Sequence, residues 1–324
     1  MIPTLVLLLL TATMQAPAAQ QPPASNDETA PFLIGVLRRD GVVSPFAAFD
    51  GKDWDIPWPD DLRSKELPIG LDSVPSKWWG KAGALKQMTA WIDGVNRGPI
   101  RLAQPTMVRL MCGPQLGLMS DYHSAQPAPS PQVQPYPKDG LAVSGSQRIE
   151  PIEMISPSSS EWAPVTALLL EPFAKAEDTA VDAFTSWKHP VRRNDRRRVP
   201  IELETMYRAE MDQPGWTAYY VEAIKKYAPG PDDDEDCGLV TSANGWVIAG
   251  PDGKRTTKLT ARVTYCDRRG VTYMLPLGLV KAHGRTYWAY QLSGYGLEGY
   301  AIVHPTPKII MQEVHYSAGS CPIY

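Results

Sequence analysis

Proline is the residue type that most restricts how this chain can fold. It occupies 32 of the 324 positions and recurs along most of the sequence. Because proline lacks a backbone N–H and its ring clashes with the preceding helical turn, long α-helices are excluded over much of the chain. Tyrosine and tryptophan, with 14 and 10 copies, favour strands and half-buried surfaces. With 43% hydrophobic residues to build a core, the sequence predicts a β-rich fold.

Apolar runs on either side of Asp-Gly pairs predict β-hairpins near the N-terminus. Residues 32–37 and 42–49 flank Asp40-Gly41, and Asp93-Gly94 follows another apolar run at 88–92. Asp-Gly is a preferred sequence for the tight turns that join two antiparallel strands. From Gly238 onward, further segments have the pattern of strands, at residues 245–249, 258–265, 271–275, 286–292, 300–303 and 309–315.

One segment has the periodicity of an amphipathic helix. Apolar residues recur at spacings of three and four from Trp162 to Trp187, after a Ser-rich sequence that ends in Glu161 and is typical of a helix start. Pro172 interrupts this pattern and predicts a kink or a division into two short helices. Residues 217–227 also fit a helix. The predicted class is α+β, predominantly antiparallel β, with one kinked amphipathic helix at about 160–187 packed on a sheet.

The first part of the chain, residues 1–19, has the properties of a cleavable secretory signal. It carries no charged side chain, and residues 2–10 are almost wholly apolar. Ala16-Pro17-Ala18 supplies the small residues that signal peptidase accepts, with Ala19 as a nearby alternative. The apolar stretch is shorter than the roughly 20 residues that span a bilayer, and no later segment resembles a transmembrane span. We therefore expect a secreted or periplasmic protein.

Composition divides the rest of the chain into two modules. Residues 20–31 are rich in Gln, Pro and Ser and predict a disordered leader. An N-terminal β-rich module is expected at 32–123 and a C-terminal α+β module at 140–324. The Pro-rich residues 124–139 between them predict an extended linker. The same residues fit a long surface loop inside a single domain equally well.

Four cysteines in an exported chain indicate two disulfide bonds. Residues 250–253 form a β-turn sequence, Gly-Pro-Asp-Gly, and Cys237 and Cys266 lie equally far from its centre. A regular hairpin closed by this turn would bring these two cysteines within bonding distance. By elimination, Cys112 then pairs with Cys321. The alternative is that the thiols are free and buried.

The sequence contains no complete catalytic, cofactor or metal-binding motif. Residues 294–299 have the spacing of a dinucleotide loop, but a strand-like segment follows where a helix is required, so no cofactor is expected. The five histidines lack the spacing of a zinc site, so no metal is expected. Serine hydrolase elbows are absent. Carboxylates remain available for hydrolysis of a glycosidic bond, namely Glu150, Glu153, Glu202, Glu204 and Glu298.

Charge gives little indication of a partner. A net charge of −3 offers no attraction for nucleic acid or anionic lipid. Two local blocks, basic at 188–198 and acidic at 232–236, are interpreted as solvated loops.

The predicted ligand site lies near the C-terminus and is aromatic. Alternation places Trp288 and Tyr290 on one face of a strand that leads into a glycine-rich turn, where backbone can approach a ligand. Aromatic rings can stack on sugars, although such residues also commonly cover a core. The candidate ligand-binding residues are Trp288, Tyr290, Tyr295, Glu298 and Tyr300.

The functional hypothesis is therefore an exported, non-catalytic binding or envelope-associated module. Its partner class is a glycan or another envelope component. The alternative is a secreted carboxylate-based hydrolase that resembles a glycosidase in its chemistry.

Overall fold

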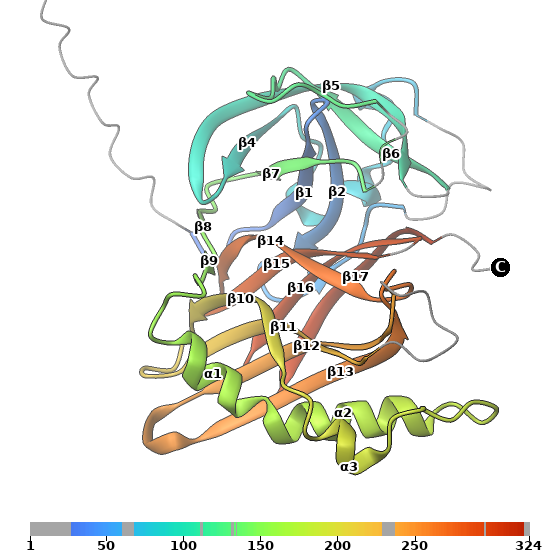
Figure 1. The fold of residues 1–324 in the computed structure, drawn as a ribbon. Coiled ribbons are helices and arrows are strands. Elements are labelled where there is room, and N and C mark those ends of the chain that lie inside the picture. The colour runs from blue at the N-terminus through green and yellow to red at the C-terminus, as the bar shows by residue number, and fades with distance from the viewer. Residues whose placement is uncertain are drawn as a thin grey trace, which may run out of the picture.

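The structure is a computed structural model that describes residues 27–59, 68–110, 113–130, 133, 135–228, 237–294 and 296–320. Strands dominate this part of the chain, and its helices are few and short. Figure 1 shows a β-barrel stacked on two β-sheets, with the α-helices beyond the second sheet. The prediction of a predominantly antiparallel β protein with some helix is confirmed.

Six strands of the N-terminal part close into a barrel, in the order β1-β7-β4-β5-β6-β2, because β2 also pairs with β1. A short strand, β3, extends the sheet beside β2. The Asp-Gly turns predicted between β1 and β2 and between β4 and β5 are present. The elements are β1 (Phe32–Arg38), β2 (Val42–Phe49), β3 (Trp54–Asp55), the 3-10 helices η1 (Leu71–Ser73) and η2 (Ser76–Ala82), β4 (Gln87–Ile92), β5 (Val95–Leu110), β6 (Gly113–Ser120) and β7 (Lys138–Val143).

The barrel continues past the position where the first module was expected to end. β7, which begins at Lys138, pairs with β1 and β4, so the chain after β6 returns to the barrel. Residues 27–31, the last part of the predicted leader, lie against the folded body. Glu28 accepts hydrogen bonds there from the backbone N–H groups of His283 and Gly284.

The C-terminal part forms two five-stranded antiparallel sheets that pack face to face. The middle sheet, β17-β16-β15-β14-β8, lies against the barrel, and the outer sheet is β13-β12-β11-β10-β9. The chain crosses from the middle to the outer sheet between β8 and β9. The elements are β8 (Ile149–Glu150), β9 (Glu153–Met154), β10 (Glu202–Glu210), β11 (Thr217–Lys226), β12 (Leu239–Ala249), η3 (Pro251–Gly253), β13 (Arg255–Tyr265), β14 (Thr272–Ala282), β15 (Arg285–Gly294), β16 (Leu297–Pro305) and β17 (Ile310–Ser320).

The middle sheet is buried on both faces. Tyr287 and Ala289 of β15 belong to the core shared with the barrel, whereas Trp288 and Tyr290 belong to the core shared with the outer sheet, which includes Trp246. The alternation predicted along this strand is therefore real, but both of its faces point into protein. A strand covered on both sides is apolar at successive positions because each residue meets one core or the other.

Residues 217–227 form strand β11 through Lys226, and the helix considered for them is wrong. β11 is the central strand of the outer sheet. Tyr220 packs toward the middle sheet, while Tyr219 and Val221 pack toward the α-helices. Burial on both faces removes the polar–apolar alternation that distinguishes a strand from a buried helix in a sequence.

The segment predicted to form one kinked helix contains two α-helices, α1 (Trp162–Leu168) and α2 (Leu170–Asp182), which meet at Leu169. Pro172 has no N–H to donate to the carbonyl of residue 168, which accounts for an interruption at this place. α2 ends before the predicted end at Trp187. A third helix, α3 (Arg193–Arg196), follows. Leu169 and Phe173 pack on the outer sheet, so the helices cover its outward face.

The basic block at 188–198 is not simply a solvated loop, because Arg196 is buried. Its guanidinium donates a 2.9 Å hydrogen bond to Asp178 and lies 3.6 Å from Glu177. Lys225 of β11 donates to the same Glu177 at 3.1 Å. These contacts join α2 and α3 to the outer sheet. Arg196 and Lys225 supply the positive charges that stabilise two buried carboxylates.

The predicted disulfide bond between Cys237 and Cys266 is present, with the two Cα atoms 5.1 Å apart. The strand register differs by one residue from the prediction, because Leu239 pairs with Tyr265 and places Cys237 opposite position 267. The bond nevertheless closes just beyond the last strand pair, where the backbone is free of the ladder.

Several predictions fall outside the described residues. They are the signal sequence at 1–19, the leader residues 20–26, the Cys112–Cys321 bond and the acidic block at 232–236.

Candidate functional site

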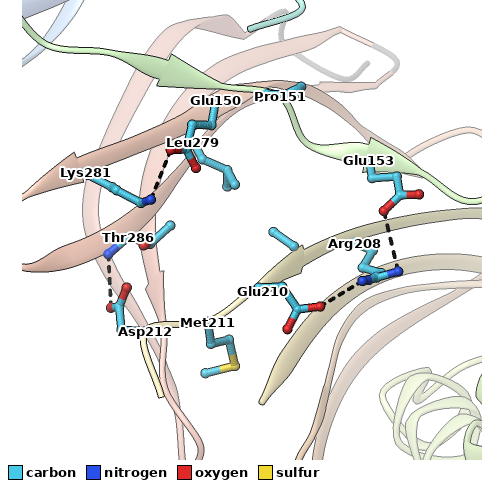
Figure 2. Close-up of a pocket in the computed structure, with 11 residues that line it drawn as sticks. Glu150, Pro151, Glu153, Arg208, Glu210, Met211, Asp212, Leu279, Lys281 and Thr286 are labelled. Atoms are coloured by element: carbon cyan, nitrogen blue, oxygen red, sulfur yellow. Dashed lines mark hydrogen bonds and ion pairs between the residues drawn. The ribbon is translucent and has the colours of Figure 1, made fainter. Parts of the chain in front are cut away.

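An open cleft of about 580 Å³ lies at the edge of the sheet pair, where the chain crosses from β8 to β9. Its walls come from both sheets, so it forms where their edges separate. Figure 2 shows its side chains, and the lining residues are Glu150, Pro151, Glu153, Arg208, Ala209, Glu210, Met211, Asp212, Leu279, Lys281 and Thr286.

The wall from the middle sheet carries an ion pair between Glu150 and Lys281, with Nζ and Oε1 3.0 Å apart (Figure 2). β8 pairs with β14 so that Glu150 lies opposite Leu279. Lys281 is two residues farther along β14 and therefore shares the face of Leu279. Strand register thus brings together two charges that are far apart in the sequence.

The wall from the outer sheet is organised by Arg208. β9 and β10 pair so that Arg208 and Glu153 are direct partners, with N and O atoms 3.6 Å apart. The same guanidinium donates to Glu210 at 2.8 Å and to Glu161 at 2.9 Å. The hydrogen bond to Glu210 is the main reason that the pKa of Arg208 is raised. Three carboxylates therefore hold one permanent cation in the cleft wall.

Asp212 lies at the end of the cleft and is kept ionised by its neighbours. It accepts the backbone N–H of Thr286 at 3.0 Å, and its carboxylate is 3.1 Å from Nε2 of His304. Burial acts to raise the pKa of Asp212, but the hydrogen bonds from His304 and Thr286 outweigh it, so the pKa is lowered. Nδ1 of His304 is buried without a hydrogen-bond partner among the described residues. No described nucleophile therefore contacts this imidazole in the way that an Asp-His catalytic arrangement requires.

The cleft as a whole is acidic. Four carboxylates face two cations among its lining residues, which leaves a formal charge of −2. Pro151, Met211 and Leu279 add apolar surface between the charged walls. This combination suits a ligand with an ammonium or guanidinium group on a short apolar body.

The other carboxylates considered for hydrolysis lie elsewhere. Glu202 binds Lys226 at 2.5 Å and Glu204 binds Arg268 at 2.7 Å, and neither lines the cleft. Within the described part of the chain, no group of three or more His, Cys, Asp or Glu side chains is arranged to hold a metal ion.

Glu222 of β11 is a buried carboxyl group outside the cleft. Burial raises its pKa to about 7, although the Met274 backbone N–H, which donates to it at 2.7 Å, acts in the opposite direction. The space beside Glu222 is only about 10 Å³, which is too small for a substrate. A proton held at this position is therefore enclosed within the sheet pair.

The residues predicted to bind a ligand lie inside the protein. Trp288 and Tyr290 are 1% and 6% exposed, and the Trp288 ring packs against Trp246 with centroids 4.9 Å apart. Glu298 and Tyr300 are fully buried near the barrel, and Tyr295 lies outside the described residues. This placement agrees with the alternative that these residues cover a core, and ligand binding by them stays a prediction.

Sequence reasoning identified part of the cleft. Glu150 and Glu153 were among the candidate carboxylates for hydrolysis of a glycosidic bond. Arg208, Asp212 and Lys281 were missed. No local motif marks them, since they reach the cleft only through pairing between distant strands.

Comparison of this chain with known protein families, with curated proteins and with solved structures gave no match. No described helix is long and apolar enough to cross a membrane.

Proposed function

We propose that this protein is an exported binding module and that its ligand occupies the cleft between the two sheets. The observation that carries the proposal is that the cleft carboxylates are engaged. Lys281 holds Glu150, Arg208 holds Glu153 and Glu210, and backbone and imidazole donors hold Asp212. A carboxylate-based hydrolase needs one carboxyl group that keeps a proton near neutral pH beside its substrate. Carboxylates that their partners keep ionised bind a ligand instead of transferring a proton to a substrate.

The acidic balance of the cleft defines the ligand class. A cationic group would enter between the two walls and meet a formal charge of −2, while its apolar part would contact Met211 and Leu279. A basic peptide segment has this chemistry.

Residues 1–19 and the Cys237–Cys266 bond support the export part of the proposal, because disulfide bonds persist in oxidising compartments. Mass spectrometry of the exported protein should find a chain that begins at Ala19 or Gln20.

Asp212→Asn is expected to weaken binding of a basic probe by about three- to tenfold, because it removes one charge and keeps the side chain's shape. The probe is the tripeptide Lys-Leu-Lys, with Glu-Leu-Glu as the matched acidic peptide, and binding is measured by titration calorimetry at low ionic strength. Asparagine still accepts the Thr286 N–H, so the fold is expected to remain intact.

Glu171→Gln is the matched control. Glu171 is exposed on α2, and this substitution removes the same charge outside the cleft. Equal loss of affinity in both variants would mean that only net charge matters. Failure of the wild type to prefer Lys-Leu-Lys over Glu-Leu-Glu would contradict the proposed ligand class.

A further inference from the structure

The outer sheet ends in a long strand with an open edge. β13 has 11 residues and pairs with β12 alone among the described strands. Within the described part of the chain, no backbone hydrogen bond joins residues 257–264 to any segment other than β12. The outward N–H and C=O groups of these residues therefore have no backbone partner in the described part of the chain. Such an edge is a template for the addition of another strand.

A groove of about 430 Å³ lies beside the last part of β13, and Leu239 of β12 also lines it. Four consecutive residues of β13, 262–265, form one side, and Phe184 and Trp187, which follow α2, form another. The Phe184 and Tyr265 side chains are 46% and 50% exposed, and the Phe184 and Trp187 rings are 5.3 Å apart. Exposed aromatic rings beside an open strand edge offer apolar contacts to an incoming segment.

Arg262 gives this groove a charge preference. It is exposed and forms no hydrogen bond or ion pair with another described residue. Its guanidinium lies over Gly270, where a Cβ atom would come within 2.6 Å of Cζ and Nε, so the absence of a side chain there lets the guanidinium take this position. Arg269 also lines the groove and is paired with Asp267 at 3.0 Å. An incoming carboxylate would meet Arg262 as its partner.

We propose that the β13 edge and this groove form a docking site for an extended, acidic peptide segment of a partner protein. The segment adds to β13 as a further strand, with an acidic side chain directed at Arg262 and apolar side chains at Phe184, Trp187 and Tyr265. Open backbone groups favour a peptide over a sugar, because a peptide can satisfy several of them in register. The site is separate from the cleft, whose lining shares no residue with it.

The test uses fluorescent peptides of alternating Val and Glu and full-length wild-type protein. Each peptide is about eight residues long, enough to follow most of β13 at about 3.3 Å per residue. The peptide with Lys in place of Glu, and a Val-Glu peptide N-methylated at alternate residues, should both bind about tenfold more weakly or worse. The first comparison tests charge and the second tests the strand hydrogen bonds, because an N-methyl amide cannot donate.

Two variants test the position of the site. Arg262→Glu and Trp187→Ala should each weaken binding of the Val-Glu peptide about tenfold, whereas Arg148→Glu, at an exposed arginine outside the groove, should leave it unchanged. Equal affinity for the N-methylated peptide would overturn strand addition. Binding of a polyuronate without binding of the peptide would also overturn the proposal, as would full affinity in folded Arg262→Glu.

Discussion

Replacing Lys138 with methionine is expected to lower the free energy of unfolding by about 3–5 kcal/mol, because it leaves a buried carboxylate without its cation. Lys138 of β7 is almost buried and pairs with Glu298 of β16, which is 0% exposed. Burial removes water from the Lys138 ammonium and lowers the pKa of Lys138. Lys138 and the Tyr300 hydroxyl, the latter at 2.6 Å, both donate to Oε1 of Glu298, and Oε2 is buried without a hydrogen-bond partner among the described residues.

Two further variants separate the ion pair from simple packing. Lys138→Met combined with Glu298→Gln should recover most of the lost stability, because an amide needs no cation and still accepts the Tyr300 hydroxyl. Lys281→Met breaks a half-exposed pair with Glu150 and should cost no more than about 1 kcal/mol. Urea unfolding at neutral pH measures all three. A small effect of Lys138→Met, comparable with that of Lys281→Met, would show that Glu298 gains little from its cation.

The same pair shows what the sequence leaves undetermined. Glu298 lies in the glycine-rich segment at 294–299, and a turn of that composition is normally exposed. The structure buries it because β16 is covered by the barrel on one face, and the covering residue, Lys138, is distant in the sequence. A charge that is buried against a distant segment has no local pattern to distinguish it from an exposed one.

Features set by neighbouring residues were predictable. The turn at Asp40-Gly41 and the bond between Cys237 and Cys266 each depend on a short stretch of chain and its turn residues. The closure of the barrel was not predictable in the same way. It depends on β7 pairing with β1 and β4 across the Pro-rich residues 124–139, whose composition resembles a linker.

The candidate site shows the same division. Glu150 and Glu153 were named from the sequence as candidate carboxylates. Their cationic partners lie on other strands. Lys281 is on β14, which pairs with β8, and Arg208 is on β10, which pairs with β9. Residue type could suggest carboxylate chemistry, but only the register shows that Glu150 and Glu153 each have a cationic partner.

Replacing Glu222 with glutamine is expected to stabilise the protein above pH 7 by about 3 kcal/mol, because it removes a carboxylate that is costly to ionise in the core. Burial raises the pKa of Glu222 from 4.5 to about 7 in the folded protein. Between these two pH values the folded state binds more protons than the unfolded state, so stability falls as pH rises. Below pH 4.5 both states are protonated, and the difference between Glu222 and glutamine should become small.

The difference in unfolding free energy between variant and wild type, measured in urea from pH 4.5 to pH 8, isolates this group from the rest of the protein. It should rise through this range and level off above pH 7. Glu202→Gln, an exposed carboxylate on the same sheet paired with Lys226, should give a nearly flat difference of less than about 1 kcal/mol. A flat profile for Glu222→Gln as well would mean that Glu222 ionises without penalty. That result would require water or a cation to reach it between the sheets, where the enclosed space is only about 10 Å³.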